Sequence, residues 1–277
     1  ALLREALRVA DEADVIVAAL GESCEMSGES ASRADITIPD AQRHLLKRLV
    51  ATGKPVVLLL FTGRPLVLDW ESDNVPAILN VWYAGSEAGH AISDAVFGRT
   101  NPCGKLTTTF PRAVGQEPLY YNYLQCSRPP WTDEHFVAYN SNYIDVANTP
   151  LYPFGYGMSY TTFEYGSPEF SSDRISADEP VKISLTVTNT GNRAGVEIVQ
   201  LYIHDCLASL ARPVKELKNF RRVTLQPGES KMVEFTLTTD ELKFYNSNLE
   251  LVYEPGAFEI MTGPDSGHLT VKLINGI

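Results

Sequence analysis

Residues 15–20 read Val15-Ile16-Val17-Ala18-Ala19-Leu20, an uninterrupted apolar run, and the chain continues as Gly21-Glu22-Ser23-Cys24-Glu25-Met26-Ser27-Gly28-Glu29-Ser30-Ala31-Ser32-Arg33. A short apolar run of this kind predicts a strand that is buried on both faces, as in a parallel sheet. Proteins with such sheets place ligands and catalytic groups in the loops that follow the strands. The loop after Leu20 carries three carboxylates, so it is the first candidate for chemistry.

Strand and helix signals alternate on both sides of this run. We expect helices at residues 2–13, from Pro39-Asp40 to about 51 and from 86 or 87 to about 98, and further strands at 55–61, 77–83 and 105–110. Apolar strands between amphipathic helices predict a largely parallel sheet that is covered on both faces. We assign residues 1–112 to this α/β sandwich domain, which carries the acidic loop.

The pattern changes twice in the rest of the chain. Residues 113–166 are rich in Tyr, Pro and Asn and show no period, which is typical of a functional loop or an interdomain connection. From residue 167 the apolar positions alternate with polar ones, and turn signals such as Asn189-Thr190-Gly191-Asn192 separate the runs. Short alternating strands of this kind predict an antiparallel β-sandwich at residues 167–277.

Composition excludes several kinds of partner. The 277 residues carry a formal net charge of −11, so phosphate backbones repel the chain and we expect no nucleic acid partner. The longest apolar run, residues 55–61, is too short to cross a bilayer, so we expect no membrane partner. The chain starts without Met in what reads as a helix in progress, which indicates that residues precede it.

Metal and disulfide signals are weak. The cysteines are Cys24, Cys103, Cys126 and Cys206, and the histidines are His44, His90, His135, His204 and His268. No C-x-x-C pair and no histidine spacing typical of zinc sites occurs, so we predict no disulfide framework and no metal site. Cys24, within the acidic loop, is expected to be a buried filler rather than a reactive thiol.

Glu29 is the carboxylate best suited to catalysis. Hydrolysis of a glycosidic bond uses one carboxylic acid to protonate the leaving oxygen and a second carboxylate as nucleophile or base. Ser27 and Gly28 can position Glu29, since glycine lets the chain turn sharply, and Arg33 can balance the local charge. On spacing alone, a solvated acidic loop is the simpler interpretation.

Longer motifs favour a catalytic role for Glu29 over a solvated acidic loop. Residues 21–39 resemble the acid/base loop of family 3 glycoside hydrolases, the β-glucosidase group. Further motifs resemble that family in the same order: Gly53-Lys54-Pro55-Val56-Val57, Gly63-Arg64-Pro65-Leu66, Trp82-Tyr83-Ala84-Gly85-Ser86-Glu87-Ala88-Gly89, Phe97-Gly98-Arg99-Thr100-Asn101-Pro102-Cys103-Gly104-Lys105-Leu106, Phe110-Pro111-Arg112 and Tyr152-Pro153-Phe154-Gly155-Tyr156-Gly157-Met158-Ser159-Tyr160-Thr161. The resemblance covers nearly the whole chain and is closest to bacterial periplasmic members, which implies a periplasmic or secreted location.

The resemblance implies both architecture and activity. The family has an α/β sandwich domain followed by a fibronectin type III-like sandwich, and Glu29 occupies the position of its general acid/base. Such retaining enzymes hydrolyse terminal, non-reducing β-D-glucosyl residues of oligosaccharides or β-glucosides without a cofactor. Their nucleophile is an Asp in an N-terminal (β/α)₈ barrel, which nothing in this chain resembles. The sequence therefore predicts a C-terminal portion that is inactive alone and needs that barrel, in the same enzyme or as a separate chain.

Other residues of the motif receive weaker assignments. Glu22, Ser27 and Arg33 are candidates for substrate binding, and a negative charge on Glu22 or Glu25 would help an acid catalyst to stay protonated. Leu68-Asp69-Trp70 echoes the family's Ser-Asp-Trp nucleophile motif, but Asp69 lies in the second domain and is expected to be a surface or capping carboxylate.

Two alternatives remain open at this stage. Tyr120, Tyr121, Trp131 and Tyr139 can form an aromatic wall for sugar rings or a packed layer between domains. The whole chain can instead be a non-catalytic carbohydrate- or protein-binding module. A surface shaped to dock a barrel should carry an apolar patch, through which a homodimer can form if the patch is exposed.

Overall fold

The computed structural model describes residues 2–125, 127–128 and 137–277. The chain divides into two compact units. The first comprises the described residues up to Phe97, with Phe110–Leu119 and Tyr143–Tyr152; the second comprises Gly98–Thr109, the described residues of Tyr120–Asn142, and Pro153–Ile277. Residues 113–166, which we expected to form one connecting segment, are thus divided between the two units.

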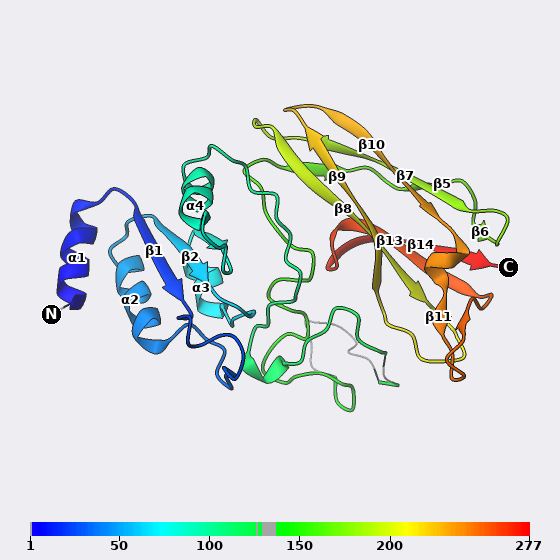
Figure 1. Ribbon diagram of the computed structural model, residues 1–277, viewed down its shortest axis with the longest axis horizontal. Helices are drawn as coiled ribbons and strands as arrows, with labels where there is room; N and C mark the ends of the chain where they lie inside the picture. Colours follow the sequence, from blue (N-terminus) through cyan, green and yellow to red (C-terminus); the bar gives the residue numbers. More distant parts are fainter. Residues whose placement is uncertain (1, 126, 129–136) are drawn as a thin grey trace. The chain divides into compact units, whose positions relative to one another are not determined.

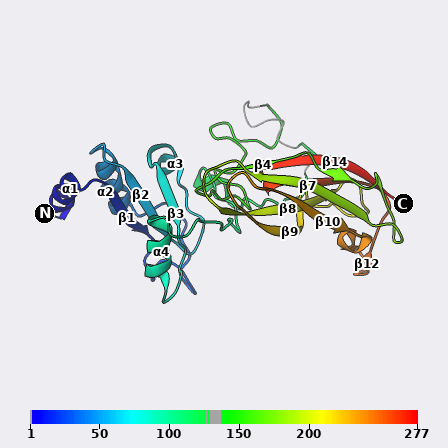
Figure 2. The same cartoon turned by 90° about the horizontal axis from the view of Figure 1, so that it is seen from above.

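A small parallel sheet organises the first unit. Its strands are β1 (Ile16–Gly21), β2 (Val56–Phe61) and β3 (Ala77–Asn80), in the order β1-β2-β3. Helices α2 (Asp40–Val50), α3 (Asp69–Asn74) and α4 (Ala88–Val96) lie around this sheet, and α1 (Leu2–Glu12) precedes β1 (Figure 1, Figure 2). A 3₁₀ turn, η1, follows at Val114–Gln116. The parallel sheet confirms the predicted α/β class.

Burial within this sheet differs between strands. In the central strand β2, Leu58 and Leu60 are fully buried, as a strand covered on both faces requires. In β1 the burial alternates, and Val17 is 50% exposed, so the expectation of two covered faces is wrong for this edge strand. The expected strand at residues 105–110 is also absent, because Phe110 makes only a single bridge, with Tyr152.

The second unit is a β-sandwich (Figure 1, green to red). One sheet has the order β10-β7-β4 with β5 paired to β7, the other has the order β6-β14-β13-β8-β9, and β11 pairs with β12. The strands are β4 (Phe163–Tyr165), β5 (Glu169–Phe170), β6 (Arg174–Ile175), β7 (Val181–Asn189), β8 (Gly195–Asp205), β9 (Glu216–Leu225), β10 (Ser230–Leu237), β11 (Phe244–Tyr245), β12 (Leu251–Val252), β13 (Ala257–Asp265) and β14 (His268–Gly276), with the 3₁₀ turn η2 at Thr239–Leu242.

Alternating side chains fill the space between these sheets. Val181, Ile183, Leu185 and Val187 of β7 are all buried, and they share one apolar core with residues of β8, β9, β10, β13 and β14. This confirms the predicted two-residue period. All pairings within the two sheets are antiparallel except that of the short β6 with β14, which is parallel.

Asn189 ends β7 and holds the turn that follows it. Its side-chain oxygen accepts hydrogen bonds from Thr161 Oγ1 (2.6 Å) and the Gly191 amide (3.1 Å). Its amide nitrogen donates to the carbonyl oxygens of Arg193 (2.7 Å) and Leu225 (3.1 Å). Since Asn189 is fully buried, no water can replace these bonds without a rearrangement.

Asn189→Ala is therefore expected to destabilise the sandwich by about 2–4 kcal/mol, because it leaves several buried polar groups without partners. Urea unfolding followed by circular dichroism measures the change. Asn192→Ala is the matched control, since Asn192 lies exposed in the same turn and should change the free energy of unfolding by less than about 0.5 kcal/mol. Equal effects of the two substitutions would contradict the anchoring role of Asn189.

Candidate active site

The acidic loop begins where β1 ends, beside the end of β2. The Glu22 amide donates to the carbonyl oxygen of Phe61 (2.8 Å), which extends the pairing of the two strands by one residue. Gly21 has φ +135°, and a Cβ there would lie 1.9 Å from the Phe61 carbonyl oxygen, so only glycine fits. The Gln42 side chain, from α2, bonds both the amide (2.7 Å) and the carbonyl (2.9 Å) of Gly21. The start of the loop is thus fixed by two neighbouring elements.

Glu22 is buried at the centre of an ion-pair network. Its Oε1 lies 2.9 Å from Arg33 Nη1 and 3.0 Å from Arg64 Nε, the latter as an ion pair rather than an aligned hydrogen bond. Its Oε2 accepts hydrogen bonds from Thr62 Oγ1 (3.0 Å) and the Gly63 amide (3.1 Å). Every contact of this carboxylate therefore joins the end of β1 to the segment after β2 or to the far end of the acidic loop.

The network decides the charge state of Glu22. Burial raises its pKa, but the bonds from Arg33, Gly63 and Thr62 and the charge of Arg64 together outweigh burial, and the net pKa is lowered. The carboxylate is consequently ionised at neutral pH, with two guanidinium groups offsetting its charge. It cannot act as the uncompensated negative neighbour of Glu29 that the sequence suggested.

Arg64 also holds the backbone of the loop. Its Nη2 donates to the carbonyl oxygens of Met26 (2.7 Å) and Ala31 (2.7 Å). These residues close two successive reverse turns, with bonds from the Met26 amide to the Ser23 carbonyl (3.0 Å) and from the Ala31 amide to the Gly28 carbonyl (3.2 Å). One half-buried cation thus ties both turns of the loop to the end of β2.

Glu29 lies at the tip of the second turn. Gly28 has φ +125° and Ser30 has φ +60°, a backbone conformation that non-glycine residues rarely adopt outside tight turns. The Glu29 side chain is exposed, and among the described residues nothing forms a hydrogen bond or an ion pair with it. The carboxyl group is therefore free to meet a ligand, while the backbone that carries it is held by Arg64.

Ser27 and Arg33 support the loop from within. A Cβ on Gly63 would lie 2.0 Å from Ser27 Oγ, so the absence of a side chain at Gly63 makes room for Ser27. Arg33 donates to the carbonyl oxygen of Thr37 (3.0 Å) besides its bond to Glu22. These contacts position the loop; none of them tests whether Glu22, Ser27 or Arg33 touches a substrate.

Two other acidic residues of the motif regions lie apart from this network. Glu25 is exposed, and so is Cys24, which corrects the expectation that this thiol fills a buried space. Asp69 begins α3 and accepts a hydrogen bond from Arg43 (2.8 Å). Burial raises the pKa of Asp69, but the bonds from the Trp70 amide and Arg43 outweigh burial, so the net pKa is lowered, as expected for a surface carboxylate that pairs with an arginine.

The aromatic candidates differ in their surroundings. Tyr121 stacks on Phe154 with ring centroids 4.2 Å apart, and it packs edge-on against Tyr202 within the second unit. Tyr120 and Tyr139 are exposed. Trp131 lies outside the described residues.

The sequence matches known protein families in both units. Residues 1–160 match the glycosyl hydrolase family 3 C-terminal domain. The chain belongs to glycosyl hydrolase family 3. Within this family 3 chain, residues 197–266 also match the fibronectin type III-like domain, which agrees with the β-sandwich of the second unit.

Individual relatives of this family 3 chain are considerably longer. It is 49% identical over 269 residues to a periplasmic beta-glucosidase of Salmonella typhimurium, covering 97% of the chain and 35% of that protein. It is 43% identical over 271 residues to a beta-xylosidase of Formosa agariphila, covering 98% and 36%. The structure of the beta-glucosidase from Listeria innocua in complex with glucose matches with a TM-score of 0.90 at 41% identity, covering 99% of the chain and 38% of that protein. The chain thus spans about a third of each relative's length and corresponds to a C-terminal portion.

The role of Arg64 as the anchor of the loop was not predicted from the sequence, where Arg64 stood out only as part of a motif. A usable signal was present: Thr62-Gly63-Arg64 follows an apolar strand directly, and in a parallel sheet that end lies beside the end of residues 15–20. Which carbonyl groups Arg64 reaches could not be read from spacing, because the loop geometry decides it.

Proposed function

We propose that this chain supplies Glu29 as the general acid/base of a retaining β-glycosidase. The observation that carries the proposal is the contrast within one loop: Glu29 is exposed and has no partner among the described residues, while Arg64 holds the turn on which it stands. An acid catalyst needs this combination of a free functional group and a fixed backbone, because misplacement by about 1 Å can lower the rate on the order of a hundredfold.

In the proposed reaction, Glu29 acts twice. Its carboxylic acid first donates a proton to the glycosidic oxygen while a carboxylate elsewhere attacks the anomeric carbon and forms a glycosyl-enzyme intermediate. The Glu29 carboxylate then takes a proton from water, which attacks the same carbon and releases the sugar. Net retention follows from the two successive displacements.

The partner of Glu29 lies outside this chain. We place the nucleophilic Asp and most of the sugar pocket in an N-terminal (β/α)₈ barrel, which suits relatives about three times as long. Asp69 is not proposed as the nucleophile, because Arg43 and the Trp70 amide already bond its carboxylate. The barrel can belong to the same polypeptide or be a separate chain, and self-association of this chain is a further prediction to be tested by its oligomeric state.

The substrate is proposed to be a terminal, non-reducing β-D-glucosyl residue. The relatives include proteins named as beta-glucosidases and two named as a beta-xylosidase or a putative beta-xylosidase, so aryl β-glucosides and aryl β-xylosides are the two substrates to compare. A periplasmic or secreted location is proposed from the Salmonella relative. Among the described residues, no helix combines the length and the apolar character needed to span a bilayer.

The chain alone is expected to show little or no hydrolysis of aryl β-glucosides, since it lacks the proposed nucleophile. Addition of the barrel as a separate polypeptide is expected to restore turnover, measured as release of the aryl alcohol. Turnover by the chain alone would contradict the division of the catalytic pair. Calorimetry with oligosaccharides provides the complementary test: tight binding by the isolated chain would favour a carbohydrate-binding module instead.

A further inference from the structure

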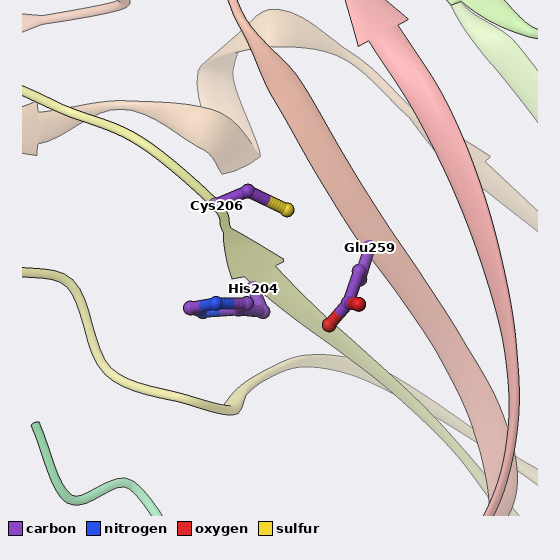
Figure 3. A group of neighbouring side chains, drawn as sticks. All are labelled: His204, Cys206 and Glu259. Atoms are coloured by element: carbon purple, nitrogen blue, oxygen red, sulfur yellow. The ribbon is translucent and has the colours of Figure 1, made fainter. Parts of the chain in front are cut away.

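Three side chains that can bind metal ions meet at the end of β8 in the second unit. His204, Cys206 and Glu259 each offer one ligand atom, and these atoms all lie within 4.8 Å of one another. Figure 3 shows His204 and Cys206 at the end of β8 and Glu259 on the neighbouring strand β13. They belong to the sandwich, not to the acidic loop, and the proposed glycosidase reaction uses none of them.

Strand pairing explains why the three side chains meet. His204 and Glu259 are direct partners in the antiparallel ladder of β8 and β13. Cys206 continues that pairing, because its amide donates to the carbonyl oxygen of Ala257 (3.0 Å). Positions 204 and 206 are two residues apart, so they lie on the same face of the sheet. The buried Ile203 and Asp205 alternate with them and face the other way.

A hydrogen bond to the backbone holds the histidine ring. Its Nδ1 lies 2.8 Å from the carbonyl oxygen of Pro213, which can only accept, so the ring proton resides on Nδ1. That leaves the lone pair of Nε2 for a cation, and a hydrogen bond from the second ring nitrogen to a backbone carbonyl is a frequent feature of metal-binding histidines. Glu259 is half-buried and, among the described residues, no cation pairs with it.

The thiol is accessible but not activated by its surroundings. Cys206 is exposed, yet burial of its sulfur and the charges of Glu259 and Asp205 raise its pKa. A raised pKa argues against a nucleophilic or redox role for the free thiol. A divalent cation reverses this effect, because its charge favours the thiolate, and the thiol proton passes to solvent as the metal–sulfur bond forms.

We propose that His204, Cys206 and Glu259 form a binding site for zinc or a similar divalent transition metal ion, which links the end of β8 to β13. A nitrogen, a thiolate and a carboxylate are the mixed donors that zinc accepts, with bonds of about 2.0–2.3 Å. In a tetrahedral site such ligand atoms lie about 3.5 Å apart, so closure from 4.8 Å needs only small side-chain rotations. Three protein ligands leave the fourth position to water.

No metal site was predicted from the sequence, because the histidines are scattered and show no metal-ligand spacing. The signal was present in another form. His204-Asp205-Cys206 places two ligands on one face of a strand, but the third ligand, Glu259, comes from a neighbouring strand whose register the sequence did not define.

Cobalt titration of the reduced 277-residue chain tests the proposal directly. We expect one Co²⁺ per chain with a cobalt–thiolate charge-transfer band, and displacement of the cobalt by Zn²⁺. Cys206→Ser should abolish the band, and Glu259→Gln should weaken binding at least about tenfold. Cys24→Ser, Cys103→Ser and Cys126→Ser are matched controls that should keep it. No band in the unaltered chain, or a band that survives in Cys206→Ser, would overturn the site.

Alkylation of the unaltered chain gives a second test that does not depend on how a variant folds. At a zinc concentration about ten times the dissociation constant, the metal-free fraction falls about tenfold, so alkylation of Cys206 should slow about tenfold. Cys24, which is also exposed, serves as the internal control and should react at the same rate with and without zinc. Peptide mass spectrometry measures both rates. Unchanged alkylation of Cys206, or equal protection of the two cysteines, would show that the three side chains hold no metal.

Discussion

In the complete enzyme, Glu29→Gln is expected to lower kcat/KM about 10²- to 10⁴-fold for glucosides with poor leaving groups, the range typical of a lost general acid. The amide has nearly the same size as the carboxyl group but cannot donate the catalytic proton. Aryl glucosides with very acidic aryl alcohols need little protonation, so their loss in the first step should be much smaller. A series of aryl β-glucosides therefore separates an acid catalyst from a residue that only binds substrate, since a binding residue affects the whole series equally.

A matched control stands in the same loop. Glu25→Gln makes the same chemical change at an exposed residue of the first turn, and it should alter kcat/KM less than about threefold because surface changes away from the reacting atoms have small effects.

The proposed role of Glu29 as general base in the second step can be measured separately. In Glu29→Ala, azide is expected to enter the space of the lost side chain and attack the glycosyl-enzyme intermediate without base assistance, giving a β-glycosyl azide. An equal loss across the leaving-group series, with no azide product, would contradict the role of Glu29.

Local patterns predicted the elements well where one face of each strand or helix meets a core. The alternation of Val181, Ile183, Leu185 and Val187 identified β7, and all four residues are buried. The continuous apolar run at residues 55–61 identified β2, a central strand that is covered on both faces. The strand predicted at residues 105–110 was wrong. Its apolar content reflects packing by single side chains such as Phe110, which is 1% exposed but does not belong to a strand.

The sequence predicted only part of the chemistry of the candidate site. The motif resemblance selected Glu29, and the spacing indicated that Arg33 balances charge within the loop. Nothing local indicated that Arg64 also pairs with Glu22, because Arg64 is distant in sequence and follows the neighbouring strand β2. The second turn of the loop has positive φ at Gly28 and also at Ser30, where no glycine marks the turn. Long-range contacts and loop conformation, rather than residue type, therefore decide how Glu29 is held.

Removal of the Glu22 carboxylate is expected to have the largest effect on the stability of the first unit. Glu22→Ala leaves Arg33 and Arg64 near a buried space without their counter-ion, together with Thr62 and the Gly63 amide without an acceptor. Loss of one partner of a buried ion pair costs about 3–5 kcal/mol, and the lower end applies here because both arginines keep partial access to water. Urea unfolding of a Trp131→Phe variant, followed by tryptophan fluorescence, measures this loss of stability. The two remaining tryptophans, Trp70 and Trp82, both lie in the first unit and report on it alone.

The same network predicts a pH dependence with a definite sign. The pKa of Glu22 is lowered in the folded state from its ordinary value of 4.5, so the folded protein binds the proton less readily than the unfolded chain. The stabilisation is therefore fully present above about pH 4.5 and is lost as the pH falls through the lowered folded value. The difference in unfolding free energy between the unaltered chain and Glu22→Gln should be largest near neutral pH and should shrink as the solution is acidified.

Glu29→Gln completes this comparison as the matched control for charge removal in the same loop. Because Glu29 is exposed and has no partner among the described residues, its substitution should change the unfolding free energy by less than about 0.5 kcal/mol at every pH. A pH-independent difference for Glu22→Gln would show that size and shape, not the ionised carboxylate, hold the loop. If Glu22→Gln keeps the fold at neutral pH but lowers kcat, with the leaving-group dependence of Glu29 unchanged, Glu22 acts on catalysis only by fixing Arg64 and the turn that carries Glu29.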